Sequence, residues 1–330
     1  MEQADFLALL GQVARLDRGQ RAALLRVLTN ADEAHEATDL VEGRQGERPA
    51  CPHCGCERLY AWGQSNGLKR WKCKNKDCRR TFNALTRTPL ARLRKRELWL
   101  AHGRALGDGI SLRKVAARCG VNLKTAFRWR HRFLKAPRDV QPATLTGIVE
   151  ADETYFLKSA KGSRQLVGRR PRKRGGKAKK PGLSDEHVPV LIARDRHSAT
   201  LSGVMFDRSE DSLTPHLEPV LAKDALLVSD GAKAYGALAR TLKLGHVGLN
   251  ISAGEIVKDG IYHIQNVNSY TSRLKDWMRR FKGVATKNLP TYLGWRRQIE
   301  TLGDALTAQY VLEVDPVWWT PQNLSRRSPR

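Results

Sequence analysis

The sequence predicts a multidomain chain in which an N-terminal helical segment, a small β module and a helical module precede an α/β domain. Three observations support this fold class. The chain has 330 residues, which is longer than one typical domain. Two closely spaced pairs of cysteines lie between residues 51 and 78. After Pro137 the spacing of apolar residues changes from the helical period to the alternation of strands.

The balance of charge favours a polyanionic partner. Lysine and arginine number 59 against 33 aspartates and glutamates, which gives a formal net charge of +26. These positive charges repel one another within a compact state unless a polyanion neutralises them, so nucleic acid is the first partner to consider. Hydrophobic residues make up 41% of the chain, enough for packed cores, which excludes wholesale disorder. No apolar run approaches the roughly 18 residues of a membrane span.

The N-terminus has no basic region followed by an apolar stretch, so we expect a cytoplasmic, nucleoid-associated protein rather than a secreted one. Thiols are kept reduced in the cytosol. The six cysteines are therefore expected to be metal ligands or free thiols rather than disulfides.

Residues 6–29 carry apolar side chains at helical spacing, with a break at Asp17-Arg18-Gly19. This pattern predicts a helical hairpin over residues 1–30. Residues 31–50 are polar, acidic and poor in large apolar groups, which is typical of a linker.

The cysteine pairs predict a zinc ribbon over residues 51–84. Each pair occupies a short turn, and 18 residues separate the pairs, so four thiolates can close tetrahedrally on one Zn²⁺. The predicted structural zinc ligands are Cys51, Cys54, Cys73 and Cys78. Cys56 and His53 complicate the choice of ligands, and we interpret Cys56 as a spare thiol. Cys119 stands alone in an apolar helical pattern and is expected in a core.

Residues 90–137 predict a helix-turn-helix module that binds DNA. A helix over residues 111–118 stops at Gly120, and Asn122 can cap a second helix. The second helix offers donors suited to phosphates and base edges in a major groove, namely Lys124, Thr125, Arg128, His131 and Arg132. The alternative is an ordinary basic helical hairpin packed in a bundle.

Two predicted strands of the α/β domain end in aspartates. One strand delivers Asp152 and a later apolar run delivers Asp230, which Gly231 follows. A pair of carboxylates at a sheet edge can hold a divalent metal ion such as Mg²⁺. The alternative is that both aspartates are turn formers or helix caps, which aspartates after strands frequently are.

The ordered combination of four motifs resembles the zinc-ribbon insertion-sequence transposases of the ISXO2-like type. The motifs are the four-cysteine ribbon, residues 150–156, residues 229–232 and residues 263–283. The resemblance implies that residues 143–312 form an RNase H-like (integrase-type) catalytic domain, a mixed sheet flanked by helices, with an Asp-Asp-Glu or Asp-Asp-Asn triad. It covers about three quarters of the chain.

Carried over by position, Asp152 resembles the first metal-binding carboxylate and Asp230 the second. The third position falls on Asn268, whose amide oxygen can ligate Mg²⁺ or Mn²⁺ without adding charge; a decayed site is the alternative. Lys275 lies seven residues later, on the same helix face, and resembles the basic residue of the family. Glu255 is a competitor for the third position. His263 resembles the family's histidine before this helix, with a helix cap, a DNA contact and catalysis as alternatives.

Residues 157–183 contain eleven lysines and arginines, which predicts a basic loop that DNA would order beside the site. Residues 313–330 are expected to form a basic tail. The resemblance implies a transposase that acts as a homo-oligomer on DNA, binds the terminal inverted repeats and the target DNA, and cuts and joins strands. The alternatives are a catalytically dead or domesticated DNA-binding regulator and a nuclease without strand transfer.

Overall fold

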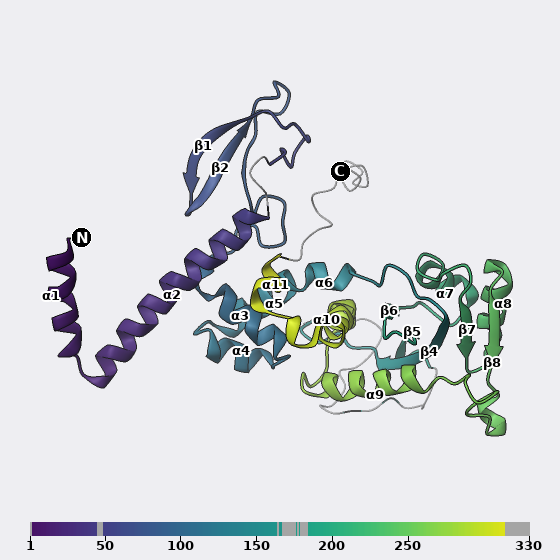
Figure 1. Cartoon of the computed structure of the whole chain (residues 1–330). Coiled ribbons are helices and arrows are strands. Elements are labelled where there is room, and N and C mark those ends of the chain that lie inside the picture. The colour runs from purple at the N-terminus through teal and green to yellow at the C-terminus, as the bar shows by residue number, and fades with distance from the viewer. Residues whose placement is uncertain are drawn as a thin grey trace. The chain divides into compact units, whose positions relative to one another are not determined.

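The computed structural model describes residues 2–44, 49–163, 165–166, 176, 178 and 184–313. The chain divides into two compact units (Figure 1). The first contains residues 1–109, 113–133 and the segment from 306, and the second contains residues 110–112 and 134–305. No helix among the described residues is long and apolar enough to cross a membrane.

The first unit begins with two helices, α1 (Gln3–Ala14) and α2 (Arg18–Gly43). The Asp17 side chain caps α2 by accepting the Gln20 amide at 2.8 Å, and the Gln20 side chain accepts the Asp17 amide at 2.9 Å. As predicted, this region is helical. No residue of α1 is buried.

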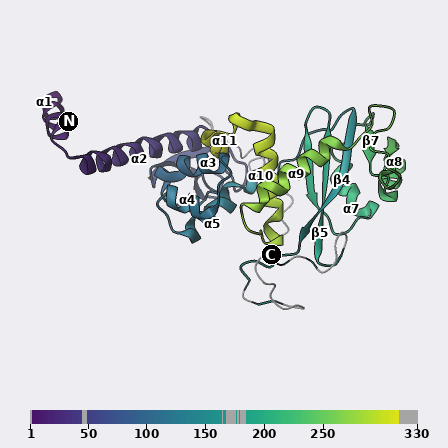
Figure 2. The same cartoon turned by 90° about the horizontal axis from the view of Figure 1, so that it is seen from below.

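The prediction of a linker was wrong for residues 31–43. They continue α2, which Figure 2 shows as one long helix. This segment contains repeated alanine and glutamate, which are strong helix formers, and it buries Ala37 and Val41. A polar composition therefore marked an exposed helix face rather than an extended chain. Residues 45–48 lie outside the described residues.

A three-stranded antiparallel sheet follows, with the order β1-β2-β3. The strands are β1 (Leu59–Ser65), β2 (Leu68–Cys73) and β3 (Thr81–Asn83). Ser65 pairs with Leu68, so Asn66 and Gly67 form a two-residue turn, with φ angles of 52° and 71°. Asn-Gly is the pair that such a left-handed hairpin turn favours.

The helix-turn-helix region is helical as predicted. It contains η1 (Arg96–Leu98), α3 (Trp99–Gly107), α4 (Leu112–Arg118) and α5 (Leu123–Phe133), and α11 (Ala308–Glu313) packs on α3. Gly120 turns the chain with a φ of 59°. The Asn122 side chain then caps α5 by accepting the Thr125 amide at 2.7 Å. Cys119 is buried, as expected of a core residue.

His102 of α3 makes this core sensitive to pH. Its ring is fully buried and meets the Trp129 and Phe133 rings edge-on, at centroid distances of 5.4 and 4.9 Å. Burial lowers the pKa of His102 to about 3. An unfolded histidine has a pKa near 6.5, so below that pH the unfolded state binds a proton that the folded state excludes.

We therefore expect the free energy of unfolding to fall as the pH drops from about 6.5 towards 3, by up to about 1.4 kcal/mol per pH unit from this residue. Urea unfolding between these pH values, in wild type and His102→Leu, measures the effect. The variant should lose less stability than wild type. Equal losses in both proteins would show that His102 does not cause the pH dependence.

The second unit is built on a five-stranded mixed sheet with the order β6-β5-β4-β7-β8. Its strands are β4 (Ile148–Leu157), β5 (His187–Asp195), β6 (Thr200–Val204), β7 (Leu226–Ser229) and β8 (Gly245–Gly248). Strand β5 is antiparallel to both β4 and β6, whereas β4, β7 and β8 run parallel. The predicted strands before Asp152 and Asp230 are thus neighbours.

Helices cover both faces of this sheet. The helices of this unit are α6 (Lys135–Asp139), which packs on α10, α7 (Glu210–Leu217), α8 (Lys233–Leu242), α9 (Gln265–Arg279) and α10 (Leu289–Leu302), with short 3₁₀ helices η2 (Ile251–Ala253), η3 (Thr286–Asn288) and η4 (Gly303–Ala305). Val149 and Ala151 of β4 share a core with Leu213 of α7 and Leu238 of α8. Figure 1 shows α9 on the other side of the sheet. Side chains alternate along a strand, so Glu150 and Asp152 lie on the α9 side.

Candidate functional site

An acidic cluster lies in the middle of β4, at the level where the neighbouring parallel strand β7 ends. The prediction that a strand ends at Asp152 was wrong, because β4 continues to Leu157. Glu150 pairs with Val228, so Asp152 and Asp230, each two residues later, reach the same level of the sheet. Carboxylate oxygens of Asp152, Glu153 and Asp230 lie within 4.8 Å of one another. The structure thus brings together the two aspartates that the sequence singled out.

Glu153 is a member of this cluster that sequence reasoning missed. Successive side chains of a strand point to opposite faces, which separates Glu153 from Asp152 in a simple strand pattern. Asp230, however, follows the last residue of β7 and reaches both. Arg208 joins them, with Nε 3.0 Å from a Glu153 oxygen and Nη2 3.8 Å from an Asp230 oxygen. The adjacent Asp-Glu pair was the only signal in the sequence.

The negatively charged carboxylates of the cluster repel one another. Burial raises the pKa of Asp152 to about 6, with the Glu153 and Asp230 carboxylates acting in the same direction and Arg208 against it. Burial also raises the pKa of Glu153. A divalent cation would relieve this repulsion, and an all-oxygen donor set suits Mg²⁺ or Mn²⁺ better than a thiolate-binding metal.

Glu150 fixes the start of α9 to β4. Its fully buried carboxylate accepts the backbone amides of Asn266 and Val267 at 2.8 and 3.0 Å, and the Asn266 side chain at 2.7 Å. Arg196 and His263 lie 3.2 and 3.4 Å from the same carboxylate. A carboxylate at this position satisfies helix amides and complements the helix dipole.

The remaining predicted residues of this region lie on or near α9. Asn268 follows the anchored Val267 in the first turn, and both Asn268 and Lys275 are exposed. Nδ1 of His263 accepts the Gln265 amide at 3.2 Å, which is a helix-cap contact. Glu255 accepts the Asn250 amide at 2.9 Å and is not a member of the acidic cluster.

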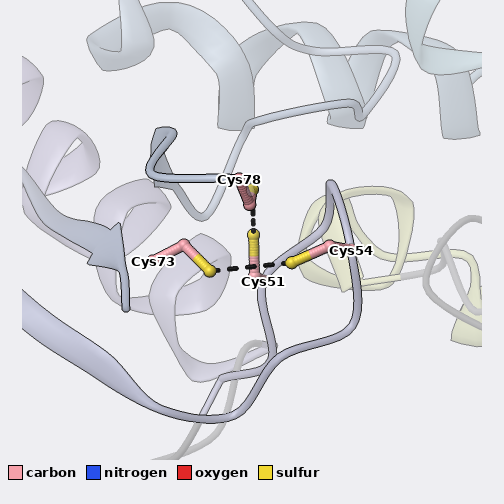
Figure 3. A group of neighbouring side chains, drawn as sticks. All are labelled: Cys51, Cys54, Cys73 and Cys78. Carbon is pink, nitrogen blue, oxygen red and sulfur yellow. Dashed lines mark hydrogen bonds between the residues drawn. The ribbon is translucent and has the colours of Figure 1, made fainter. Parts of the chain in front are cut away.

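The four predicted zinc ligands form a second cluster (Figure 3). Cys51 and Cys78 have sulfurs 3.8 Å apart, and Cys54 and Cys73 have sulfurs 3.6 Å apart. A tetrahedral zinc site with bonds of about 2.3 Å has sulfur separations of about 3.8 Å, so the donors fit Zn²⁺. Cys56 lies outside the cluster, with its sulfur 3.7 Å from the Arg58 carbonyl.

Helix α5 presents the side chains predicted to contact DNA. Ala126, Trp129 and Phe133 are buried and define the inner face. Lys124 and Arg128 are exposed, whereas the other three predicted contacts, Thr125, His131 and Arg132, are partly exposed. The outer face of α5 can therefore meet phosphates and base edges.

Two regions of the chain match models of known families. Residues 144–296 match the ISXO2-like transposase domain. That match includes the acidic cluster and all of α9, while residues 90–138, which contain α3 to α5, match the homeodomain-like domain. No curated protein matches the chain.

Two solved structures are similar to the chain at 10% sequence identity. One is a simian T-cell lymphotropic virus intasome in complex with PP2A regulatory subunit B56 gamma, with a TM-score of 0.30 over 66% of this chain and 75% of that chain. The other is a pre-cleavage Mos1 transpososome, with a TM-score of 0.17 over 64% of this chain and 77% of that chain.

The basic loop of the transposase domain is described only in part. Near its start, Lys161 donates to the carbonyls of Phe281, Lys282 and Gly283 at 3.1, 3.2 and 2.7 Å. These carbonyls follow the C-terminus of α9, where a cation is favourable. Residues 167–175 and 179–183 of the predicted loop, and residues 314–330 of the predicted tail, lie outside the described residues.

Removing the Glu150 anchor should strongly destabilise the transposase domain. Glu150→Ala leaves two helix amides, Arg196 and His263 without their buried partner, a change typically worth about 3–5 kcal/mol. Glu255→Ala is the matched control, because it removes one backbone contact outside the core. Urea unfolding should show the loss for Glu150→Ala alone. A loss below about 1 kcal/mol would contradict the anchoring role.

Proposed function

We propose that this chain is an insertion-sequence transposase that binds the terminal inverted repeats of its element and catalyses metal-dependent cleavage and strand transfer of DNA. The observation that carries the proposal is the meeting of Asp152 and Asp230 at one sheet edge within the matched transposase domain. Asp230 does accept the Ala232 amide at 3.0 Å, as a turn former would. That role alone does not explain why three half-buried carboxylates converge despite their repulsion.

We also propose an RNase H-like fold for the second unit. In chain order its five strands are arranged 3-2-1-4-5, with three antiparallel strands followed by two that run parallel to the first. This arrangement supports the assignment because it places the first and fourth strands side by side and parallel. Asp152, in the middle of the first strand, and Asp230, directly after the fourth, then lie at the same level of the sheet.

Asp152 and Asp230, with Asn268 as a neutral third ligand, would hold Mg²⁺ or Mn²⁺. Glu153 adds a carboxylate that can bind directly or through water. A bound divalent ion supplies a Lewis acid that lowers the pKa of water and neutralises charge developing on the phosphoryl group.

The protein's own residues bind and orient the DNA for this reaction. Water and then a DNA 3′-hydroxyl act as nucleophiles in line with the scissile bond, so no side chain forms a covalent intermediate. Lys275, exposed on α9, can pair with a phosphate beside the carboxylates. Glu150 keeps the first turn of α9 against β4 and so holds Asn268 in place.

The upstream modules would provide recognition. The outer face of α5 would contact the terminal repeats through Lys124, Thr125, Arg128, His131 and Arg132, and the zinc ribbon would act with it as one DNA-binding unit. A homo-oligomer on DNA would hold both element ends, and the target DNA enters the same complex. We place this activity in the cytoplasm, at the nucleoid.

The test uses the full zinc-loaded chain with labelled duplexes that carry the element ends, in Mg²⁺ or Mn²⁺. Wild type should nick these ends and join them to a target. Asn268→Ala should lose both activities, whereas Gln265→Ala, an exposed amide in the same turn, should retain them. Cleavage without joined products would identify a nuclease. Binding without any cleavage would identify a DNA-binding regulator with a decayed site.

A further inference from the structure

The outward face of the small N-terminal sheet carries two exposed aromatic rings. Tyr60 and Trp62 lie on the edge strand β1, whose pairing with β2 shifts register between Ala61 and Gln64. Tyr60 pairs with Lys72 across the sheet, and the Lys72 ammonium stands over the Trp62 ring, so both rings lie on the face of Lys72. Their exposed fractions are 53% and 48%. Two large exposed rings on one face form an apolar patch, and such patches are typical of binding sites.

The other face of this sheet already has its core. Leu59 and Trp71 pack there with Phe82 around the cysteine cluster. Since the zinc ribbon is stabilised from that side, its fold does not need Tyr60 and Trp62 as core residues. Their exposure therefore calls for a functional explanation.

Lysines from β2 and the residue after it stand over these rings. The Lys72 ammonium lies 4.2 Å from the Trp62 ring centroid, and the Lys74 ammonium lies 4.4 Å from that of Tyr60. Strands β1 and β2 contain no aspartate or glutamate. The face thus combines aromatic surfaces with two lysine ammonium groups. An exposed cation–π contact contributes about 0.5–1 kcal/mol, which is weak enough to rearrange on binding.

We propose that this aromatic face, defined as Tyr60, Trp62, Lys72 and Lys74, binds unpaired bases of a DNA strand. Bases stack on the two rings while the lysines pair with the adjoining phosphates, the combination by which proteins hold single strands without reading their sequence. A duplex hides the faces of its bases between neighbouring pairs, so the rings select unpaired nucleotides. The proposal goes beyond the proposed function because it requires neither the acidic cluster nor cleavage.

Fluorescence anisotropy of the full zinc-loaded chain, without Mg²⁺, tests the proposal. The probes are a labelled oligothymidylate of about 15 nucleotides, a duplex of the same length and the equivalent RNA strand. Tyr60→Ala/Trp62→Ala should weaken single-strand binding about tenfold or more, because stacking contributes about 1–3 kcal/mol per base. Duplex binding should change less than about twofold. Phe6→Ala, an exposed aromatic on α1, is the matched control.

Two further variants separate stacking from charge and from folding. Tyr60→Phe/Trp62→Phe should retain single-strand binding, whereas Tyr60→Leu/Trp62→Leu should lose it although apolar groups remain. Lys72→Gln/Lys74→Gln should reduce the slope of log affinity against log salt by about 1.4, at roughly 0.7 for each phosphate contact on a single strand. The aromatic variants should keep the wild-type slope. Zinc content and circular dichroism verify that each ribbon is folded.

Several results would overturn the proposal. Leucine variants that bind single strands as well as phenylalanine variants would exclude stacking. Equal losses for duplex and single strand would assign the face to general DNA binding. Tighter binding of the RNA strand, by about tenfold or more, would replace DNA as the ligand. None of these outcomes depends on catalysis, so a failure of the transposase proposal leaves this test intact.

Discussion

Asp152→Ala and Asp230→Ala should each lower the rates of DNA cleavage and strand transfer by about a thousandfold or more. Each variant removes a carboxylate from the proposed metal site, and the charge stabilisation lost is several kcal/mol, where about 1.4 kcal/mol corresponds to a factor of ten. Binding of element ends should persist, because the homeodomain-like domain lies outside the cluster. Gel assays of nicked and joined products measure both activities.

Measurements of folding stability distinguish the loss of catalysis in these variants from a loss caused by unfolding. Burial and the neighbouring carboxylates raise the pKa of Asp152 to about 6. The folded state therefore holds a proton that the unfolded state has released, and metal-free stability falls as the pH rises from about 4 to 6. Asp152→Ala should remove this dependence and raise the melting temperature at neutral pH. Asp224→Ala, an exposed aspartate outside the cluster, should change neither stability nor activity.

A variant without Asp152 or Asp230 that still cuts at the wild-type rate would contradict the assignment of the acidic cluster as the catalytic centre. A melting temperature that falls sharply in both variants would instead give these aspartates a structural role.

Cys73→Ser should unfold the residues from 51 to 84 and abolish the zinc binding expected of the four-cysteine cluster. Structural zinc contributes about 10–16 kcal/mol of apparent binding free energy to small domains, so loss of one ligand removes most of the stability of the ribbon. Burial raises the pKa values of the Cys51 and Cys73 thiols, so without metal both stay protonated at neutral pH. Circular dichroism and zinc content by mass spectrometry would measure the change.

Cys56→Ser is the matched control, because the Cys56 sulfur contacts a carbonyl outside the four-cysteine cluster. It should retain zinc and fold, while a strong chelator should reproduce the Cys73→Ser result in wild type. Release of zinc from Cys56→Ser, or its tight retention in Cys73→Ser, would show that the ligand set is different.

The sequence predicts those parts of the site that local patterns determine. Paired cysteines on short turns must approach one another, so Cys51 and Cys54 identify the cluster without a structure. Asp152 and Asp230 were found because each was expected to end a strand. This holds for Asp230, which follows β7, whereas β4 continues past Asp152 to Leu157; the two meet because they lie at the same level of neighbouring parallel strands. The change from helical to alternating periodicity also predicted that strands follow the helical modules, and the first of them, β4, begins at Ile148.

Other contacts depend on tertiary structure and leave no local signal. Glu150 resembles any carboxylate of a strand until α9, more than a hundred residues later, places its amides against it. Arg208 reaches the acidic cluster from the turn before α7, which no spacing rule predicts. At residues 31–43 a local signal was present but was misinterpreted. Their low hydropathy reflected an exposed helix and not a linker.

The Glu150 anchor has a consequence for the evolution of the site. The start of α9 is held by a residue that is buried away from solvent, whereas the Asn268 side chain is exposed one residue beyond the anchored amides. Substitutions at exposed positions usually change folding stability by less than about 0.5 kcal/mol. Residue 268 is therefore free to drift between amide and carboxylate side chains while the helix keeps its place. A saturation library at this single codon should yield folded proteins that differ in metal requirement.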